Sequence, residues 1–233
     1  MVEHRMIMEN VLISVWLNGD QGNVILAPGI PQQFDKYHPF VEQMSRLKYN
    51  LFIPHYIGTR DSLGDFTIAN STKSVAVAIR LAKKGEFKEL FSQKILNWNC
   101  KKNYLMGFSY GALPSLLQDE SIDKTILICP FISLQHHLKG KSGENVEETF
   151  RFLERAYPKT YGFKTEKVLN DLSKVVLPKK TEKIIVVRGL NDISIPQEEL
   201  DYLNAHYDVL MLTKEGNHTI QMTDSFILKL IGE

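Results

Sequence analysis

Short apolar runs alternate with stretches of helical periodicity along most of the chain, and this alternation is the feature that most constrains the fold. A short apolar run bounded by turn residues is typical of a buried strand, and apolar residues three or four apart are typical of an amphipathic helix. Their alternation predicts an α/β fold, in which a mostly parallel sheet carries helices on both faces. The predicted strands are residues 13–17, 24–27, 50–53, 104–106, 124–128, 183–187 and 209–212, and the predicted helices are residues 39–47, 68–83, 110–117, 146–156, 196–204 and 220–231.

The apolar run at residues 11–17 lies near the N-terminus, where secretion signals occur. No small-residue cleavage site follows it, so the run is interpreted as a strand. The polar turn Asn18-Gly19-Asp20 predicts a hairpin that joins strands 13–17 and 24–27. No run approaches the ~18 apolar residues that span a bilayer, so we expect a cytoplasmic protein without a membrane span.

The composition, with 43% hydrophobic and 24% charged residues, is typical of a globular protein. A length of 233 residues favours a single domain. The formal net charge of +1 supplies no long-range field, so we expect no nucleic-acid partner. Cys100 and Cys129 are too few for a disulfide framework or a zinc site, and both flank predicted strands. We therefore expect buried free thiols and no metal.

Gly107-Phe108-Ser109-Tyr110-Gly111 matches the pattern G-x-S-x-G. This pattern predicts a sharp turn from strand to helix that lifts the serine hydroxyl clear of the sheet, and crowding in the turn favours glycine on either side. An apolar run precedes the motif and a helix-compatible run follows it, which is the context that the pattern requires. Ser109 is therefore the candidate nucleophile, and the alternative is a surface turn that happens to contain a serine.

A serine hydroxyl becomes nucleophilic when a histidine takes its proton, and an acid orients that histidine. In this arrangement the chain order is serine, acid, histidine. His218 follows strand 209–212 and is the candidate base, because ligands of parallel sheets bind at the carboxyl ends of strands. Asp192 follows strand 183–187 and is the candidate acid, with a helix-capping or turn aspartate as the alternative.

Other histidines and acids after Ser109 are less well placed. His206 precedes its strand, and His136 and His137 lie in a long polar stretch. Asp201 and Glu215 do not directly follow a strand. These five residues are weaker candidates for the base and the acid.

Hydrolysis of an acyl group passes through a negatively charged oxygen that preorganised N–H donors stabilise. One expected donor is the backbone N–H of Tyr110, the residue after the nucleophile. The second is expected from the loop after strand 24–27, where Gly29 allows a tight turn and Pro31 has no N–H, which leaves Ile30. A simple Pro-Gly turn is the alternative. Gly29 and Phe108 are the candidate substrate-binding residues, although core packing would also explain an aromatic residue at position 108.

Residues 133–178 interrupt the alternation of strands and helices with a long, polar and partly helical stretch. A simple connection between two strands would be far shorter. We interpret this stretch as a small cap inserted over the active site, and an ordinary surface excursion is the alternative.

Together these motifs resemble the α/β-hydrolase superfamily, in particular its esterase-, acylglycerol-lipase- and dipeptidyl-peptidase-like members. Residues 54–64 resemble the loop that lines the active site in those members, whereas many members carry His-Gly in place of Pro28-Gly29. The resemblance implies hydrolysis of esters, thioesters or amides without a cofactor. The residues that carry it, in family order, are 27–31, 54–64, 107–111, 189–196 and 216–218.

The expected reaction is the hydrolysis of a carboxylic ester or thioester of small or medium acyl size through an acyl-enzyme intermediate. A serine peptidase or amidase is the alternative within the same chemistry, and Glu144, Glu147 and Glu148 are candidates for binding a peptide N-terminus. A non-catalytic binding protein and a cofactor-free oxidative enzyme or lyase are alternatives on the same fold. The expected partner is a small acyl substrate, and a homodimer remains open.

Overall fold

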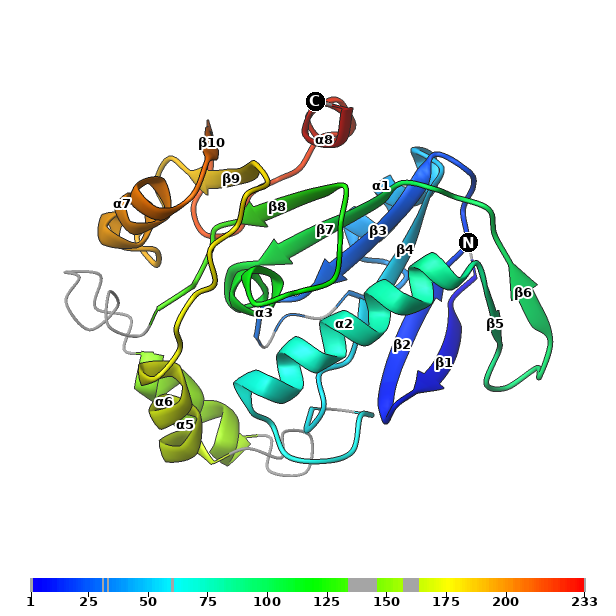
Figure 1. Ribbon diagram of the computed structural model, residues 1–233, viewed down its shortest axis with the longest axis horizontal. Helices are drawn as coiled ribbons and strands as arrows, with labels where there is room; N and C mark the ends of the chain where they lie inside the picture. Colours follow the sequence, from blue (N-terminus) through cyan, green and yellow to red (C-terminus); the bar gives the residue numbers. More distant parts are fainter. Residues whose placement is uncertain are drawn as a thin grey trace.

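The computed structural model describes residues 2–30, 32, 34–59, 61–133, 146–156 and 164–232. Within these ranges the core is an eight-stranded sheet with the strand order β1-β2-β4-β3-β7-β8-β9-β10 (Figure 1), and β5 and β6 form a separate hairpin. The strands are β1 (His4–Met8), β2 (Val11–Trp16), β3 (Gly22–Ala27), β4 (Tyr49–Pro54), β5 (Glu86–Lys88), β6 (Ile95–Asn97), β7 (Asn103–Phe108), β8 (Lys124–Ile128), β9 (Ile184–Gly189) and β10 (Val209–Lys214). The helices are α1 (Pro39–Arg46), α2 (Ile68–Lys84), the 3₁₀ turn η1 (Ser109–Gly111), α3 (Ala112–Leu116), α5 (Val146–Ala156), α6 (Thr165–Ser173), α7 (Gln197–His206) and α8 (Asp224–Gly232).

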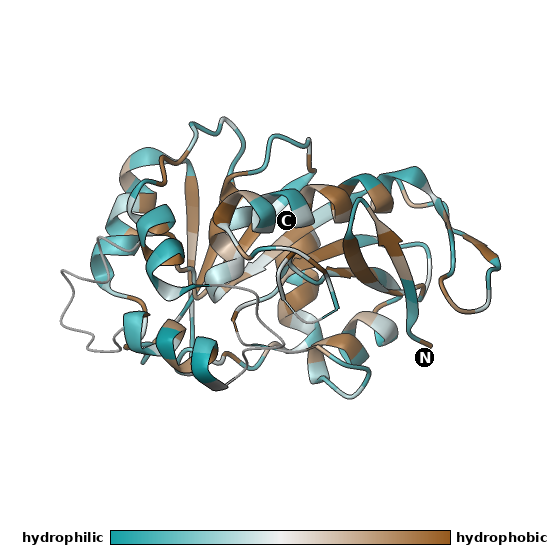
Figure 2. Ribbon diagram, turned by 90° about the horizontal axis from the view of Figure 1, so that it is seen from below, coloured by the Kyte–Doolittle hydropathy of each residue, from teal (hydrophilic) through white to brown (hydrophobic). Residues whose placement is uncertain are grey.

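Six neighbouring strands, β4, β3, β7, β8, β9 and β10, run parallel. Near one edge of the sheet, β2 pairs antiparallel with both β4 and the edge strand β1, so β1 has the same direction as the six. In Figure 1, α2 and α3 cross in front of the sheet and α1 lies behind it. Figure 2 shows hydrophobic strands enclosed by helices whose outer faces are hydrophilic. The predicted α/β fold, with a mostly parallel sheet and helices on both faces, is confirmed. No helix within the described ranges combines the length and the apolar character that crossing a bilayer requires.

The predicted hairpin between residues 13–17 and 24–27 is wrong. β4 lies between β2 and β3, and it pairs antiparallel with β2 and parallel with β3. The hairpin partner of β2 is β1, a half-exposed edge strand whose residues show no regular alternation of polar and apolar side chains. Glu9 and Asn10 join these strands with φ values of 52° and 67°. Positive φ at both central residues is the geometry that favours a two-residue hairpin turn.

Most other predicted elements are present with boundaries that differ by a few residues, and the predictions for 124–128 and 146–156 coincide with β8 and α5. The last helix begins at Asp224 instead of residue 220, because residues 218–223 form a loop that leaves the sheet edge. Helix α6 was not predicted, since its buried residues Val168 and Leu172 stand in a polar stretch. The short hairpin of β5 and β6 was also not predicted.

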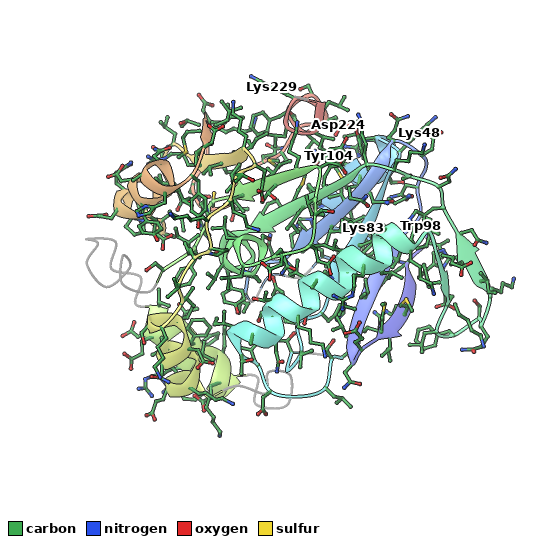
Figure 3. The ribbon with its side chains drawn as sticks, in the orientation of Figure 1. Lys48, Lys83, Trp98, Tyr104, Asp224 and Lys229 are labelled. Carbon is green, nitrogen blue, oxygen red and sulfur yellow. The ribbon has the colours of Figure 1, made fainter. Side chains whose placement is uncertain are left out.

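Three asparagines on adjacent strands form a hydrogen-bonded row at the end of the sheet where the parallel strands begin. Asn50 on β4 donates to Asn23 on β3 over 3.1 Å, and Asn23 donates to Asn103 on β7 over 3.0 Å. Asn23 also donates to the Ala82 carbonyl in α2, which accepts a second bond from Trp98, labelled in Figure 3. Because a buried amide without partners is costly, this row favours one register of the three strands.

Candidate active site

Ser109 occupies the sharp turn between β7 and α3. Its φ is 48°, in the left-handed region that a residue other than glycine rarely adopts. The backbone is crowded on both sides of the turn. A Cβ at Gly107 would lie 2.7 Å from the Gly111 carbonyl oxygen, and one at Gly111 would lie 2.0 Å from the Ala27 carbonyl oxygen. The two glycines of the motif are therefore required by close backbone approach.

The structure brings Ser109, His218 and Asp192 together, although they lie far apart in the sequence. His218 Nε2 is 2.9 Å from Ser109 Oγ, and His218 Nδ1 is 3.1 Å from Asp192 Oδ2. An ionised carboxylate can only accept hydrogen bonds, so Nδ1 carries the ring proton and Nε2 is free to accept one from the serine hydroxyl. The Asp192 side chain is 1% exposed, whereas that of His218 is 33% exposed. The imidazole can therefore be reached from solvent, and the carboxylate cannot.

Several donors hold the Asp192 carboxylate in its ionised form. Burial raises the pKa of Asp192, but hydrogen bonds from His218, from the Cys129 thiol and from the Ser194 N–H outweigh burial and leave the pKa below its ordinary value. The Ser194 N–H contacts Oδ1 at 2.9 Å. Asp192 thus remains an anion beside the imidazole, as an orienting acid requires.

Cys129 lies next to Asp192 at the end of β8, and it is buried as predicted, whereas Cys100 is only partly buried. Among the described residues, ligand atoms of Cys129, Asp192 and His218 lie within 4.8 Å of one another, a spacing that could hold a metal ion. Burial and the Asp192 charge raise the pKa of the Cys129 thiol to about 12. Zinc binds the thiolate form, and Asp192 is already paired with His218, so these residues fit a metal poorly.

The weaker candidates for base and acid that the structure describes are exposed side chains. His206 is exposed at the end of α7, where its Nδ1 is 2.8 Å from the Tyr202 carbonyl oxygen. Asp201 is exposed on α7. Glu215 directly follows β10, contrary to the expectation, because the strand extends two residues beyond its predicted end; its side chain is exposed. His136, His137 and Glu144 lie outside the described residues.

The loop after β3 lies directly against the nucleophile. A Cβ at Gly29 would lie 3.2 Å from Ser109 Cβ and 3.3 Å from the Phe108 carbonyl oxygen. Ile30, Ser109 and Tyr110 line the same cavity. The two residues predicted as oxyanion donors therefore line the same cavity as Ser109, while Pro31 lies outside the described residues.

Two cavities meet at Ser109, Ile30 and His218. The smaller one, of about 280 Å³, lies beneath α5 and has a mainly apolar wall that includes Phe131, Phe150 and Ile195. The larger one, of about 620 Å³, is lined by the predicted substrate-binding residues Gly29 and Phe108 and by further residues from α1 and from the loop after His218. They include Phe40 and Gln43 of α1 and Thr219 and Gln221 after His218, together with Gln32 and His38 from the segment between β3 and α1.

The ring of Phe108 packs edge to face against Phe34 and Phe40, with ring centroids 5.8 Å and 5.7 Å away. Phe108 therefore both lines the larger cavity and belongs to an aromatic cluster. Sequence periodicity identified α1 as a core helix, but it gave no sign that Phe40 and His38 face a cavity. That information depends on which loops fold over α1.

Glu199 is a buried carboxylate that the sequence patterns did not single out. It is 0% exposed, and it accepts hydrogen bonds from the Ile132 and Ser133 N–H groups at 2.8 Å and 2.9 Å. The neighbouring Phe131 N–H donates to the Ser109 carbonyl over 3.1 Å. Glu199 therefore fixes the segment after β8, which forms one wall of the smaller cavity. A Glu in the first turn of a predicted helix is ordinarily a surface residue, so no local signal identified it.

No protein-family model matches the sequence, and no curated protein matches it. Solved structures of similar shape are numerous. Est1E from Butyrivibrio proteoclasticus matches with a TM-score of 0.66 and 14% identity over 99% of each chain. A putative hydrolase from Agrobacterium vitis S4 matches with a TM-score of 0.64 and 14% identity over 99% of this chain and 98% of that one. An esterase from Pyrococcus furiosus matches with a TM-score of 0.63 and 16% identity over 93% of this chain and 82% of that one.

At these identities the likeness concerns the fold. The order of strands, the turn at Ser109 and the positions of Asp192 and His218 after β9 and β10 agree with the resemblance found in the sequence. A further solved structure matched over 98% of this chain is an α/β hydrolase from a sediment metagenome. The protein therefore has the α/β-hydrolase fold.

Proposed function

We propose that this protein is a serine hydrolase that cleaves a carboxylic ester or thioester of small or medium acyl size through an acyl-enzyme intermediate. The observation that carries the proposal is the continuous chain of hydrogen bonds from Ser109 through His218 to Asp192, with Nε2 of the histidine 2.9 Å from the serine hydroxyl oxygen. This arrangement activates a serine nucleophile. The names of the similar Est1E and of the Pyrococcus furiosus esterase support ester hydrolysis over other reactions of the fold.

In the first step Ser109 Oγ attacks the carbonyl carbon while His218 Nε2 takes the hydroxyl proton. The carbonyl π electrons move to the oxygen, which the N–H groups of Ile30 and Tyr110 stabilise. When the tetrahedral intermediate collapses, the bond to the leaving oxygen breaks and His218 gives its proton to that oxygen. The alcohol leaves, and the acyl group remains on Ser109.

In the second step His218 takes a proton from water, whose oxygen attacks the acyl carbon. The bond to Ser109 Oγ then breaks, the serine regains its proton from His218, and the carboxylic acid leaves. In both steps the imidazolium forms beside the buried Asp192 carboxylate. The negative charge of Asp192 stabilises this cation and keeps Nδ1 protonated, so that Nε2 always faces the serine.

The two cavities suggest how an ester is divided between them. Both cavities have mainly apolar walls, but the larger one also contains Gln32, His38 and Gln221, which can bind polar groups. We therefore assign the acyl chain to the cavity beneath α5 and the leaving group to the larger cavity. Val146, Thr149 and Phe150 of α5 line the acyl side. On this proposal residues 133–178 act as a cap whose helix α5 limits the length of the acyl chain.

The function is tested with p-nitrophenyl esters from acetate to laurate, with methyl ferulate added because ferulic acid is bound in a structure of the similar Est1E. We expect hydrolysis to be fastest for short or medium acyl chains and slow for laurate, because the acyl cavity is only about 280 Å³. Mass spectrometry after reaction with a fluorophosphonate should place the modification on Ser109. A wild-type protein that neither hydrolyses an ester nor reacts with the fluorophosphonate would contradict the proposed function.

The proposed role of α5 predicts that Thr149→Trp shifts the acyl preference toward shorter chains. Thr149 is an exposed residue that lines the acyl cavity, so a larger side chain fills the cavity without disturbing the core. Its matched control is Glu148→Trp, because Glu148 also lies on α5 but does not line this cavity. We expect kcat/KM for octanoate relative to acetate to fall at least about tenfold in Thr149→Trp and to stay near wild type in the control. If Thr149→Trp instead changes the preference for the alcohol, the assignment of the two cavities is reversed.

A further inference from the structure

We propose that Tyr56 is a positioning residue for the oxyanion loop, which comprises residues 28–30, and that its hydroxyl holds the peptide that precedes the Ile30 N–H donor. This inference rests on the proposed function. It adds a residue that lines neither of the two cavities at Ser109 and that acts through the Pro28 backbone.

The hydroxyl of Tyr56 donates a hydrogen bond to the Pro28 carbonyl oxygen over 2.8 Å, and Tyr56 is only 3% exposed. Its ring packs edge to face against Phe66 and Tyr110, with centroids 6.4 Å and 5.7 Å away. Burial raises the pKa of Tyr56 well above its ordinary value, so the hydroxyl stays protonated and can donate. Both Tyr56 and Pro28 are buried, beside a cavity of only about 40 Å³ that both residues line. A hydrogen bond in such a setting is stronger than one exposed to solvent.

The accepting carbonyl is one peptide away from the proposed donor. The Pro28 carbonyl belongs to the peptide that ends in the Gly29 nitrogen, and the next peptide carries the Ile30 N–H. Gly29 lacks a side chain that would restrict its backbone. Contacts of the neighbouring peptide must therefore fix its orientation, and Tyr56 provides one at the Pro28 oxygen. The close approach of the Pro28 oxygen to Gly111, 2.8 Å from a Cβ built there, provides another.

The backbone around Tyr56 is itself anchored. The N–H and the hydroxyl of Thr59 donate to the Tyr56 carbonyl over 2.8 Å and 2.7 Å. The adjacent Ile57 N–H donates to Ser74 of α2 over 3.0 Å. One turn earlier in α2, Ser71 accepts a 2.9 Å hydrogen bond from the hydroxyl of Tyr110. Both proposed oxyanion donors are therefore connected to α2, Tyr110 by its own side chain and Ile30 through Tyr56.

The test compares Tyr56→Phe with Tyr207→Phe. The control is closely matched, because the hydroxyl of Tyr207 also donates to a proline carbonyl, that of Pro178, over 2.8 Å. Each variant loses one tyrosine-to-carbonyl hydrogen bond and keeps its ring. Only the first loss lies beside the proposed oxyanion loop.

The kinetic readout is kcat and KM for the preferred p-nitrophenyl ester. Removing an oxyanion donor outright typically lowers kcat by about 10²- to 10³-fold, so a donor that is present but less well held should lower it by about tenfold. An effect confined to the transition state leaves KM within about twofold. Tyr207→Phe should keep the wild-type kcat.

A second readout separates positioning from a general loss of structure. A trifluoromethyl ketone forms a hemiketal oxyanion on Ser109, whereas the product acid does not react with the serine. We expect Tyr56→Phe to weaken inhibition by the ketone about tenfold, in step with kcat/KM, and to leave inhibition by the product acid unchanged.

Wild-type kcat and ketone inhibition in a folded Tyr56→Phe protein would overturn the inference. Equal losses in Tyr56→Phe and Tyr207→Phe would also overturn it, because they would show a general effect of stability. Failure of the proposed function is distinguishable from both outcomes. In that case the wild-type protein itself hydrolyses no ester, and Ser109 does not react with the fluorophosphonate.

Discussion

Ser109→Ala is expected to lower kcat for ester hydrolysis by about 10⁴- to 10⁶-fold. The variant lacks the oxygen that His218 activates and that would carry the acyl group. The remaining activity comes from the oxyanion donors and the two cavities, which can still bind the ester and a water molecule. Since alanine removes only the hydroxyl oxygen from a residue at the cavity surface, we expect the fold to be retained. The measurement is initial-rate kinetics at saturating ester, with circular dichroism to confirm folding.

The control for this substitution is Ser173→Ala, which removes an exposed hydroxyl at the end of α6 and should leave kcat unchanged. The double variant Ser109→Ala/His218→Ala should be scarcely slower than Ser109→Ala alone, because the two side chains act as one unit. If Ser109→Ala hydrolysed the ester at the wild-type rate, the assignment of the nucleophile would be wrong. If the two substitutions reduced kcat independently, His218 would act on something other than the Ser109 hydroxyl.

Gly111→Ala is expected to destabilise the protein by about 3 kcal/mol or more, because the new methyl group overpacks a rigid contact. A Cβ at Gly111 would lie 2.0 Å from the Ala27 carbonyl oxygen and 2.6 Å from its carbonyl carbon. Both atoms belong to backbone at the end of β3, so no flexible side chain can move aside. The turn at Ser109 and the oxyanion loop must separate, and any folded protein that remains should also lose ester hydrolysis. Urea unfolding followed by fluorescence measures the loss of stability.

Gly232→Ala is the matched control, since a Cβ at Gly232 meets no atom within 4 Å. This substitution should change the free energy of unfolding by less than about 0.5 kcal/mol. A Gly111→Ala protein as stable and as active as Gly232→Ala would show that β3 and the turn at Ser109 are not in tight contact.

The parts of this structure that sequence patterns predicted correctly are those that depend on local chemistry. The turn at Ser109 is encoded in five consecutive residues, and Asp192 and His218 could be singled out because each lies in a loop at the carboxyl end of a strand. The structure brings these three residues together, as the chain order of the motif led us to expect, while their catalytic roles stay a prediction.

Features that depend on non-local pairing were not predictable from the same patterns. The turn at residues 18–20 suggested a hairpin, but the hydrogen bonds of β2 go to β1 and β4. Nothing near Val11 in the sequence indicates that the weakly patterned residues of β1 complete the edge of the sheet. The bonds of Glu199 and Tyr56 likewise reach backbone groups 67 and 28 residues away. Each of these side chains looks like an ordinary helix or loop residue until the strand order is known.

Glu199 has a consequence for how this fold can vary. The residues from Asp192 to Glu199 contribute the proposed acid at one end and, at the other, two hydrogen bonds that fasten the chain at Ile132 and Ser133. These hydrogen bonds attach the start of the insertion, residues 133–178, to the segment that carries Asp192. The attachment does not depend on the sequence of the rest of the insertion. We expect that the insertion can be exchanged for one of another length or sequence while the serine, histidine and aspartate keep their geometry. The insertion then determines substrate specificity and can be replaced, while Ser109, His218 and Asp192 carry out the same reaction with every insertion.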